Sequence, residues 1–596
     1  MNPTSEILER INKSSNDHHD GVFTRLYRYL LREDIYFAAY QKLYSNKGAM
    51  TPGTDADTAN GFGKEYVQQL IQELKDGTYQ PKPVRRIYIP KRNGKMRPLG
   101  IPSFRDKLLH EAIRTILEAI YEPLFMDQSH GFRPGRSCHT ALNQIKISFR
   151  SVKWFIEGDI KGCFDNIDHN VLIHTLEKKI KDSKFINVIR EFLKSGYVED
   201  FQYNTTLSGT PQGGIISPIL ANIYLHELDV KVMEIKSNFD SPASKYQTPE
   251  YRHLAKRRQT LQKKIDRVSG EEREEAIKEY KQVCKEKLCT PARMNDDKRL
   301  VYCRYADDFI IGVTGNHEDC EEIKEALRVF LQDCYHLELS VEKTKVTHSA
   351  ERIRFLGYDI AVRRNQEVKK RKDGVRMRTL SNSVELTVPL EEKIMKYLFD
   401  NDIVEQRPNG EIWPVAKPQL RHMAERDIVR RYDTQVRGIC NYYCLAANYD
   451  KLNYFRYLME YSCLKTLASK HDSTTAQVLK KYKTADGWSI PYETKEGVKY
   501  AHITVLSSCK AGKMMVDHNP WQFTSFDPKK LTQKKRLDAG RCELCGTECD
   551  SCKIYHAGSM NKLKSTTDWG KKMLHMRRKT LIVCPECFRK IAESKS

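Results

Sequence analysis

The chain has 596 residues, and a prior of one domain per ~150 residues predicts about four domains. Hydrophobic residues make up 40% of it and aromatic residues 10%, which excludes an intrinsically disordered chain. Lys plus Arg number 101 and Asp plus Glu 78, so the formal net charge is 101 − 78 = +23. This excess favours a polyanionic partner such as nucleic acid over a merely soluble basic protein, because cations that neutralise phosphates release counterions.

The sequence offers no membrane anchor. No apolar run approaches the ~20 residues of a spanning helix, and the polar start, Met1–Asn16, has no signal-peptide core. We therefore expect a cytoplasmic protein without a membrane partner. Its 17 cysteines are expected to be reduced thiols, except where six of them cluster within residues 542–596.

Helix and hairpin signals come first along the chain. Residues 22–43 are apolar at helical spacing, and residues 46–63 form a Gly-containing loop. Residues 87–90 and 97–102 are short strands around an Asn93–Gly94 turn, which predicts a hairpin. Ile113, Ile116, Leu117 and Ile120 then mark one buried helix face.

Strands return in the middle of the chain. Residues 154–156 predict a strand that runs into Asp159, and residues 300–305 and 309–313 predict a hairpin around residues 306–308. Between them, residues 237–298 form a charged insert, which we interpret as a solvated helix hairpin. From about Leu390 the pattern is wholly helical, and basic irregular sequence begins near Trp488.

Asp307 and Asp308 are the first residues with a chemical signature. Two adjacent carboxylates between apolar strand residues are costly to bury unless a cation neutralises them. An exposed acidic turn is the alternative, and we favour it for Asp296–Asp297, whose neighbours are polar. The flanks of Asp307 and Asp308 are instead apolar. With Asp159 at the end of another strand, the three acids could hold two Mg²⁺ ions about 4 Å apart, as in two-metal nucleotidyl transfer.

Several blocks of the sequence resemble those of group II intron-encoded reverse transcriptases, and most closely the LtrA-type maturases. Residues 305–308 resemble the Tyr-x-Asp-Asp box. The other blocks follow in the family's order and cover nearly the whole chain: Asn46–Gly53, Arg97–Pro102, His130–Pro134, Glu157–His169, Gly209–Pro218 and Arg354–Tyr358.

The resemblance implies an α+β fold: a right-hand-like polymerase with fingers and palm on antiparallel sheet, a helical thumb, a basic region and a small zinc-bound domain. The expected divisions are 1–135 for N-terminal extension and fingers, 136–365 for the palm with its insert at about 237–298, 366–487 for thumb and maturase domain, 488–541 for a DNA-binding region, and 542–596 for the zinc-binding domain.

Site roles also follow from the resemblance. Asp159, Asp307 and Asp308 are the implied Mg²⁺ ligands. Phe164 matches the aromatic residue that excludes a ribose 2′-hydroxyl, and Gln212 the residue that touches the incoming nucleotide or its template partner. Lys91 and Arg97 would meet the triphosphate, and Lys343 would lie near the primer end. In isolation, Phe164 and Gln212 also suit ordinary packing and turn roles.

The helical segment after residue 390 resembles the family's thumb and maturase region. Its marks are Arg437–Gly438, Asn441–Tyr443 and Ser462–Lys470. Interleaved Tyr, Lys and Arg on helices suit a nucleic-acid backbone and unstacked bases. The alternative is an amphipathic bundle whose tyrosines pack inside.

Cysteine pairs dominate the tail. Cys542 with Cys545, and Cys584 with Cys587, have the spacing of one four-thiolate Zn²⁺ site. Cys549 and Cys552 form a third pair that could compete for the metal. Because a small tail buries little core, we expect its folding to depend on the metal.

Members of the family use this scaffold for an HNH endonuclease, in which paired histidines and a later histidine hold the catalytic ion and supply a base. Here the pair reads Tyr555–His556, the later positions read Phe588 and Ala592, and Lys562, beside Asn561, fills the asparagine position. The tail is therefore expected to have lost cleavage, with His556 as a vestigial residue.

The sequence as a whole predicts an RNA-directed DNA polymerase that also binds its group II intron RNA to promote splicing. The implied partners are the intron RNA, target DNA and deoxynucleoside triphosphates, and the oligomeric state, monomer or homodimer, stays open. One rival is a polymerase without an intron. The other is a pure RNA-binding splicing factor, which would have no reason to retain three costly carboxylates.

Overall fold

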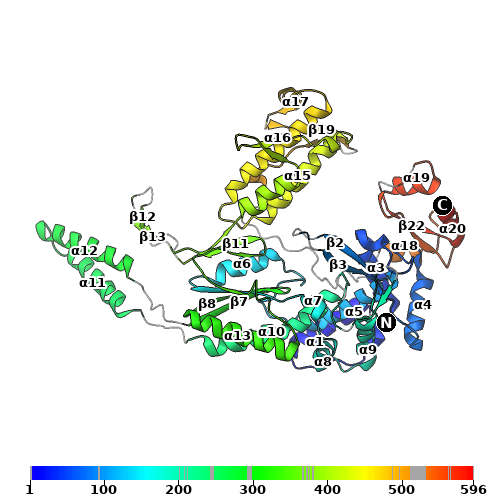
Figure 1. Cartoon of the computed structure of the whole chain (residues 1–596), viewed down its shortest axis with the longest axis horizontal. Helices are drawn as coiled ribbons and strands as arrows, with labels where there is room; N and C mark the ends of the chain where they lie inside the picture. Colours follow the sequence, from blue (N-terminus) through cyan, green and yellow to red (C-terminus); the bar gives the residue numbers. More distant parts are fainter. Residues whose placement is uncertain are drawn as a thin grey trace.

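The computed structural model (Figure 1) describes residues 3–90, 94, 96–199, 202–206, 208–210, 213–241, 247–290, 298–364, 368–370, 374, 376–378, 382–485, 487–494, 497–509, 532–560, 563 and 565–594. Helices and strands are mixed along this chain, and its sheets are small and mostly antiparallel. No helix in the described ranges is both long enough and apolar enough to cross a bilayer.

The N-terminal region packs helices around α5 and beside one four-stranded sheet of order β3-β2-β5-β6. The predicted pairing of the two strands is confirmed, since β2 and β3 pair antiparallel, from Arg85 with Ile101 to Pro90 with Met96. Asn93, in the predicted turn, lies outside the described residues. The elements are α1 (Thr4–Asp17), α2 (Tyr27–Leu30), α3 (Glu33–Leu43), η1 (Lys47–Met50), β1 (Phe62–Gly63), α4 (Lys64–Asp76), β2 (Val84–Pro90), β3 (Met96–Ile101), α5 (Phe104–Tyr121), α6 (Cys138–Ser148), α9 (Ser183–Lys194), β5 (Tyr197–Glu199) and β6 (Gln202–Asn204).

The helical spacing of residues 22–43 is confirmed only in part. The segment divides into α2 and α3, and its start is extended. The backbone of Phe23 accounts for this, because its N–H donates to Lys179 O and its carbonyl accepts from Lys181 N, each at 2.8 Å. These bonds hold the extended segment at Phe23 against the chain just after residue 179, and this tertiary pairing overrides the local helical pattern.

The central sheet has the strand order β7-β8-β4-β9 and is covered on both faces. Ile156, Tyr302 and Ile311 pack into one core and Phe155, Cys303 and Ile310 into the other. Burial on both faces explains why these strands are continuously apolar. The elements are β4 (Trp154–Asp159), α7 (Cys163–Asn166), α8 (His169–Lys179), α10 (Ser217–Phe239), β7 (Arg299–Tyr305), β8 (Asp308–Thr314), α13 (His317–Tyr335) and β9 (Lys345–His348).

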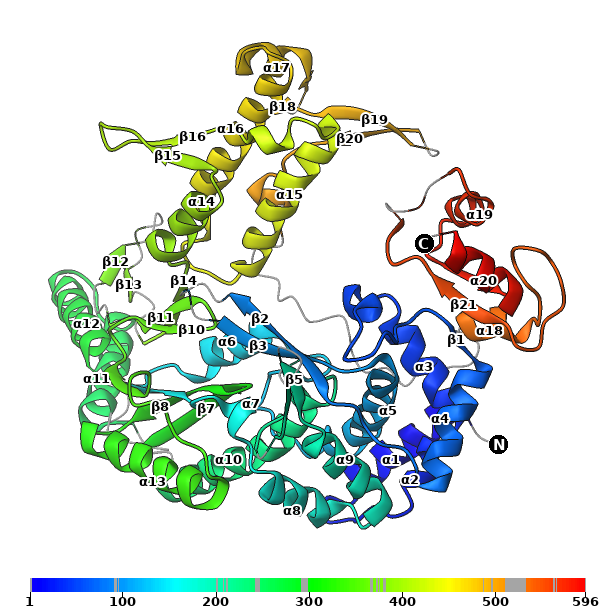
Figure 2. The same ribbon diagram turned by 45° about the vertical axis from the view of Figure 1, so that its right-hand side comes forward.

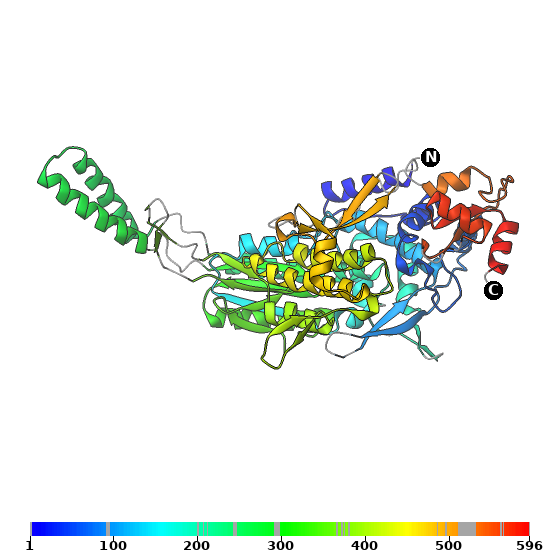
Figure 3. The ribbon, with the colours of Figure 1, turned by 90° about the horizontal axis from the view of Figure 1, so that it is seen from above.

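The charged insert forms two antiparallel helices, α11 (Pro249–Ile265) and α12 (Glu271–Cys289), which meet at the Ser269–Gly270 break. This hairpin projects far from the central sheet (Figure 3). Leu261, Ala276 and Val283 are its buried residues, and Arg257 pairs with Glu279 across it at 2.6 Å. Its remaining surface is largely polar and exposed, as the helical register predicts.

A helical body stands above the central sheet (Figure 1). The expectation that it would be wholly helical was wrong, because β15 and β16 form a hairpin between its helices. Strands of three residues are too short to leave a periodic signal. The elements are β10 (Ile353–Phe355), β11 (Tyr358–Val362), β12 (Val368–Lys370), β13 (Arg376–Arg378), β14 (Val384–Thr387), η2 (Leu390–Met395), α14 (Lys396–Asp400), β15 (Val404–Gln406), β16 (Ile412–Pro414), η3 (Pro418–Leu420), α15 (Glu425–Tyr442), η4 (Tyr449–Lys451), α16 (Leu452–Lys470), α17 (Thr475–Lys481), β17 (Lys483–Thr484), β18 (Gly487–Trp488), β19 (Ile490–Thr494), β20 (Gly497–Ala501) and η5 (Leu506–Ser508).

Tyr442 and Tyr443, at the end of α15, join this helix to the β10–β11 turn and to α6. The hydroxyl of Tyr442 donates to Leu356 O at 2.7 Å, and that of Tyr443 donates to Gly357 O at 3.2 Å. The carbonyl of Tyr442 accepts from both His139 Nε2 and the Tyr358 hydroxyl. These two tyrosines therefore pack at a junction, so the packing alternative describes them better than contact with unstacked bases.

The C-terminal tail is not a free-standing unit. Strand β21 pairs with β22 and also with β1, near the start of the chain, so that the three form one sheet. Figure 2 shows the tail beside α3 and α4. Leu537, Cys552, Ile554 and Ile582 belong to the large core of the N-terminal half. The tail elements are α18 (Thr532–Asp538), β21 (Lys553–His556), α19 (Asp568–Met576), β22 (Thr580–Val583) and α20 (Pro585–Glu593).

Candidate active site

The β4 and β8 strands bring the three predicted carboxylates together. Asp159 is the register partner of Asp308 in the antiparallel pair, and Asp307 lies in the turn before it. The turn is tight, since Ala306 has a φ of 58°. A side chain on Gly158 would begin 2.1 Å from the Phe309 ring, so the glycine leaves the space that this buried ring occupies.

A second segment closes over the same turn. A Cβ on Gly131 would lie 2.3 Å from Ala306 N, which requires glycine at that position. The backbones of His130 and Arg304 pair at 2.9 Å. In the sequence, residues 130–134 are one of the blocks that resemble the family. In the structure, they pack directly against the turn.

Arg304 holds this turn from inside the protein. Its guanidinium and the carboxylate of Asp229 have no exposed side-chain surface. Arg304 Nε donates to Asp229 Oδ1 at 2.7 Å and one terminal nitrogen donates to Oδ2 at 2.6 Å. The other terminal nitrogen donates to the carbonyl of Ala306 at 2.9 Å. The ion pair thus ends directly on the backbone between Tyr305 and Asp307.

Further buried hydrogen bonds complete the network. Arg304 donates to Ser129 Oγ at 2.9 Å, and the Tyr302 hydroxyl donates to Asp229 Oδ1 at 2.8 Å. Asn222, on α10, donates to the carbonyl of Gly131 at 2.8 Å. Every guanidinium donor of Arg304 and both carboxylate oxygens of Asp229 are therefore satisfied, as a buried ion pair requires.

The negative charges of the three carboxylates oppose one another at this turn. Burial, followed by the charges of Asp307 and Asp159, raises the pKa of Asp308 to about 7. Burial also raises the pKa of Asp307 above its usual range, and the charge of Arg97 acts in the opposite direction. Lys343 Nζ donates to Asp159 Oδ2 at 2.8 Å, and this bond raises the pKa of Lys343. Crowded acids beside one lysine form a site that gains from a divalent cation.

Of the other residues predicted to contact the nucleotide, Arg97 and Phe164 lie in the part of the chain that the structure describes. Arg97 is exposed on β3, and its positive charge acts to lower the pKa of Asp307. Phe164 lies on α7, with its ring centroid 6.3 Å from that of Phe132 in an edge-on contact, and its carbonyl accepts from Thr210 N at 2.7 Å. Lys91 and Gln212 lie outside the described residues, and so does the Asn561–Lys562 pair.

The four predicted zinc ligands converge. The Sγ atoms of Cys542, Cys545, Cys584 and Cys587 all lie within 4.8 Å of one another. Cys584 caps helix α20 and accepts from Cys587 N at 3.5 Å. Hydrogen bonds from Thr547 lower the pKa of Cys545 to about 6. Four thiol groups at this spacing, one of them readily ionised, suit tetrahedral zinc. Cys549 and Cys552 are not part of this cluster.

His556 occupies an interior position. Its side chain is buried, its Nε2 donates to Tyr44 O at 3.0 Å, and its Nδ1 accepts from Gly558 N at 3.0 Å. Its backbone N–H donates to Asn60 at 3.0 Å. Both ring nitrogens are engaged with backbone groups, which fixes one tautomer and gives the ring a structural role.

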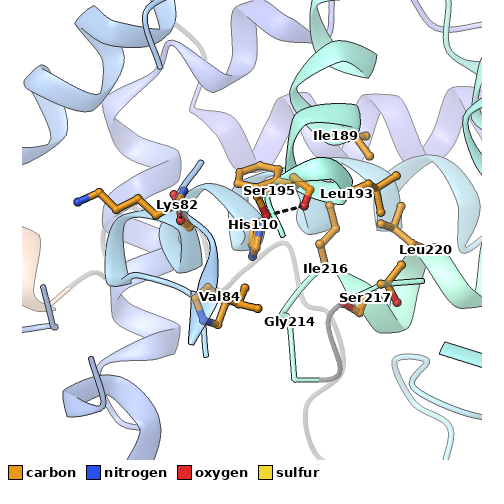
Figure 4. A pocket seen from close by; sticks show the side chains of 14 residues that line it. Lys82, Val84, His110, Ile189, Leu193, Ser195, Gly214, Ile216, Ser217 and Leu220 are labelled. Carbon is orange, nitrogen blue, oxygen red and sulfur yellow. Dashed lines mark hydrogen bonds between the residues drawn. The ribbon is translucent and has the colours of Figure 1, made fainter. Parts of the chain in front are cut away.

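A separate apolar pocket lies between strand β2 and helices α5, α9 and α10 (Figure 4). His110 faces it with neither ring nitrogen hydrogen-bonded, and burial lowers its pKa to about 3. Its ring centroid lies 4.1 Å from that of Phe192. Asp159, Asp307 and Asp308 do not line this pocket. His110 is a neutral core residue rather than part of the active site.

Sequence reasoning overlooked Arg304 and Asp229. A signal was present, since Arg304 is a charge inside a strand whose neighbours are apolar, and such a residue requires a buried partner. Asp229 gave no signal, because α10 carries acidic residues on both exposed and buried faces. Its partnership depends on a contact between residues 75 positions apart.

Comparison with known proteins agrees with this geometry. Residues 89–246 and 274–360 match the model described as reverse transcriptase (RNA-dependent DNA polymerase). Residues 381–523 match type II intron maturase, and residues 542–588 match AI2M/AI1M-like, HNH endonuclease. The fold and site define a reverse transcriptase joined to an intron maturase.

Relatives match along the full chain. The group II intron-encoded protein LtrA of Lactococcus lactis subsp. cremoris is 50% identical over 595 residues, which cover 99% of each chain. An uncharacterized 91 kDa protein in the cob intron of Schizosaccharomyces pombe is 36% identical and covers 99% of this chain and 72% of its own. A putative COX1/OXI3 intron 2 protein of Saccharomyces cerevisiae is 30% identical, with 99% and 68% covered. The chain belongs to the group II intron-encoded reverse transcriptase/maturase family.

The pKa of Asp308 predicts a pH-dependent stability difference. A carboxyl whose folded pKa is raised from 3.8 to about 7 stabilises the folded state below its ordinary pKa and loses this contribution as pH rises towards 7. In chelator, the melting temperature of the wild type should therefore fall relative to Asp308→Asn between pH 5 and pH 8. Mg²⁺ should narrow the difference at pH 8. A difference between the two proteins that does not vary with pH would contradict the assignment.

Proposed function

We propose that this protein copies RNA into DNA at a two-metal site formed by Asp159, Asp307 and Asp308, and that it binds its own intron RNA for splicing and mobility. The proximity of the three acids carries the proposal. Two Mg²⁺ ions held there would activate a primer 3′-hydroxyl and steady the triphosphate leaving group. Deoxynucleoside triphosphates and, at insertion, a target DNA are the further partners.

The chain's own residues prepare this site. Lys343 forms an ion pair with Asp159. A lysine at this position is also proposed to lie near the primer end. Arg97, one strand away, offers a guanidinium to the triphosphate, and Lys91 is proposed for the same role. Gln212 is proposed to contact the templated base pair. The division into fingers, palm, thumb with maturase domain, basic region and zinc-binding domain at residues 135, 365, 487 and 541 belongs to the same proposal.

Phe164 is proposed as the residue that selects deoxynucleotides. It follows Asp159 by one short turn, and its backbone is tied to Thr210, next to the Gly209–Pro218 block. Phe132 supports the ring from the side. A ring that packs against Phe132 on a hydrogen-bonded backbone has little freedom to make room for an additional hydroxyl, so exclusion by shape is the expected mechanism.

The tail is proposed to bind one structural Zn²⁺ and to have lost DNA cleavage. A nuclease ion needs several ligands and an accessible base. Tyr555 is buried, the ring of Phe588 packs 6.5 Å from that of Tyr555, and His556 is engaged at both nitrogens. Mobility would then use a primer made elsewhere, such as a nascent strand at a replication fork.

Asp307→Ala and Asp308→Ala should abolish primer extension on an RNA template with Mg²⁺, because each removes a metal ligand. Binding of the intron RNA should persist, since the acids and the basic helical body lie on different elements. Extension assays and filter binding on the same preparations test both parts. Full polymerase activity in either variant would refute the site assignment.

Phe164→Ala should admit ribonucleotides. Loss of the ring opens space for a 2′-hydroxyl, and the preference for a deoxynucleotide over its ribo analogue should fall by roughly 10- to 200-fold. Phe164→Tyr keeps the ring and is the matched control. The measurement is the ratio of incorporation efficiencies for the two nucleotides, and an unchanged ratio would leave Phe164 as a packing residue.

The purified protein should contain about one zinc per chain, which Cys542→Ser loses and Cys549→Ser, outside the cluster, retains. His556→Ala should destabilise the protein by about 1–3 kcal/mol through the lost buried hydrogen bonds.

The ribonucleoprotein should not nick the second strand of a DNA target with Mg²⁺ or Mn²⁺. Efficient nicking that His556→Ala abolishes would show that the tail keeps a nuclease.

A further inference from the structure

Helix α16 carries an exposed row of aromatic residues. Tyr454, Tyr457, Tyr461 and Lys465 recur at spacings of three and four, which places them along one face. The rings of Tyr454 and Tyr457 are stacked, with centroids 6.4 Å apart and planes 13° apart. The centroids of Tyr457 and Tyr461 are 4.5 Å apart. Tyr454 is 52% exposed and Tyr457 45%.

The β15–β16 hairpin extends this row. Lys465 Nζ lies 4.5 Å from the ring centroid of Trp413, and the Arg407 guanidinium carbon lies 3.7 Å from the same centroid. Lys465 also donates to Pro414 O at 2.7 Å, which fixes the hairpin against the helix. We call Tyr454, Tyr457, Tyr461, Lys465, Trp413 and Arg407 the aromatic ridge.

Packing does not explain the ridge. The opposite face of α16 contains Phe455, Met459 and Ser462 and packs against α15, where the Tyr432 hydroxyl bonds Ser462 at 2.9 Å. The stability of the helix is therefore secured on that side. Large exposed aromatic side chains gathered in one row are uncommon on a surface without a partner.

The charge of the ridge indicates what that partner is. Within the described ranges, the side chains of Arg407 and Lys465 contact the Trp413 ring and the Pro414 carbonyl, and neither is in an ion pair with a carboxylate. Burial and the nearby charge of Arg407 lower the pKa of Lys465, and the charge of Glu405 only partly offsets them, so the two cations repel each other. A phosphate placed between them would relieve this repulsion. A protein partner would need matched acidic and apolar groups, whereas a nucleic acid supplies both phosphates and flat rings.

We propose that the aromatic ridge binds single-stranded RNA, with unpaired bases stacked on Tyr454 and Tyr457 and the backbone phosphate held by Arg407 and Lys465. Stacking on tyrosine requires a base free of its duplex neighbours, so the ligand is an unpaired segment rather than a helix. The inference rests on the RNA-binding function proposed above and assigns it a particular surface.

The test uses the full-length protein and a 12-nucleotide oligouridine RNA as probe. Fluorescence anisotropy should show binding that weakens by ~10-fold in Tyr457→Ala and further in the double variant with Tyr454→Ala, in keeping with the contribution of one stacked base. Tyr457→Phe keeps the ring and should bind as the wild type. Tyr500→Ala removes a tyrosine that is 58% exposed on another strand and should have no effect. Arg407→Ala should reduce the salt dependence of binding.

Three results would overturn the proposal. They are failure of the wild type to bind oligouridine, wild-type affinity for oligouridine in Tyr457→Ala, and a loss of affinity in Tyr457→Ala that is as large for an RNA duplex of the same length as for the single strand. Unchanged RNA affinity in the double variant would leave the ridge as a surface for a protein. As a second measurement, binding of whole intron RNA by the wild type is determined in parallel. Failure of that second measurement counts against the RNA-binding function itself, whereas intact intron binding with unaffected ridge variants counts against the ridge alone.

Discussion

The buried ion pair between Arg304 and Asp229 is the interaction on which the active site depends. Removing two charges from water costs several kcal/mol per ion, and only good geometry with further hydrogen bonds offsets that cost. Here both acceptor oxygens of Asp229 are used, and the remaining guanidinium donors reach Ser129, Asn222 and the Ala306 carbonyl. One residue thus connects α10, the segment before Gly131 and the catalytic turn.

The need for this support follows from the charges that the turn carries. Asp307 is half-buried and Asp308 is exposed at the start of β8, both beside Asp159. Partial loss of hydration and then the charges of the neighbouring acids raise the pKa of both carboxyls. The turn is closely packed against the segment at Gly131, where a Cβ would lie 2.3 Å from Ala306 N. Arg304 fixes the backbone and Lys343 neutralises one acid. A site held in this way is arranged for its cations before they bind, which limits reorganisation during the reaction.

Much of this arrangement could be predicted from the sequence, because it depends on local patterns. The β7–β8 hairpin around the Asp pair, Asp159 at a strand end and the two cysteine pairs all follow from residues close together in the chain. Contacts between distant segments could not be predicted. The two residues of β1 that complete the tail sheet are too few to leave a pattern. Tyr442 and Tyr443 have the same composition signal as the exposed Tyr454 and Tyr457, and only packing distinguishes the two pairs.

The claim that Arg304 positions the catalytic turn is tested most directly by the single-turnover rate of nucleotide addition in Arg304→Met/Asp229→Asn. This pair removes both charges together, so no ion is left buried alone, and it keeps an acceptor for Tyr302. In a variant shown to be folded by its melting curve, the rate at saturating nucleotide should fall by roughly 100-fold, the order that a misplacement of about 1 Å costs, while nucleotide affinity changes little. A rate within twofold of the wild type in the folded variant would contradict the account.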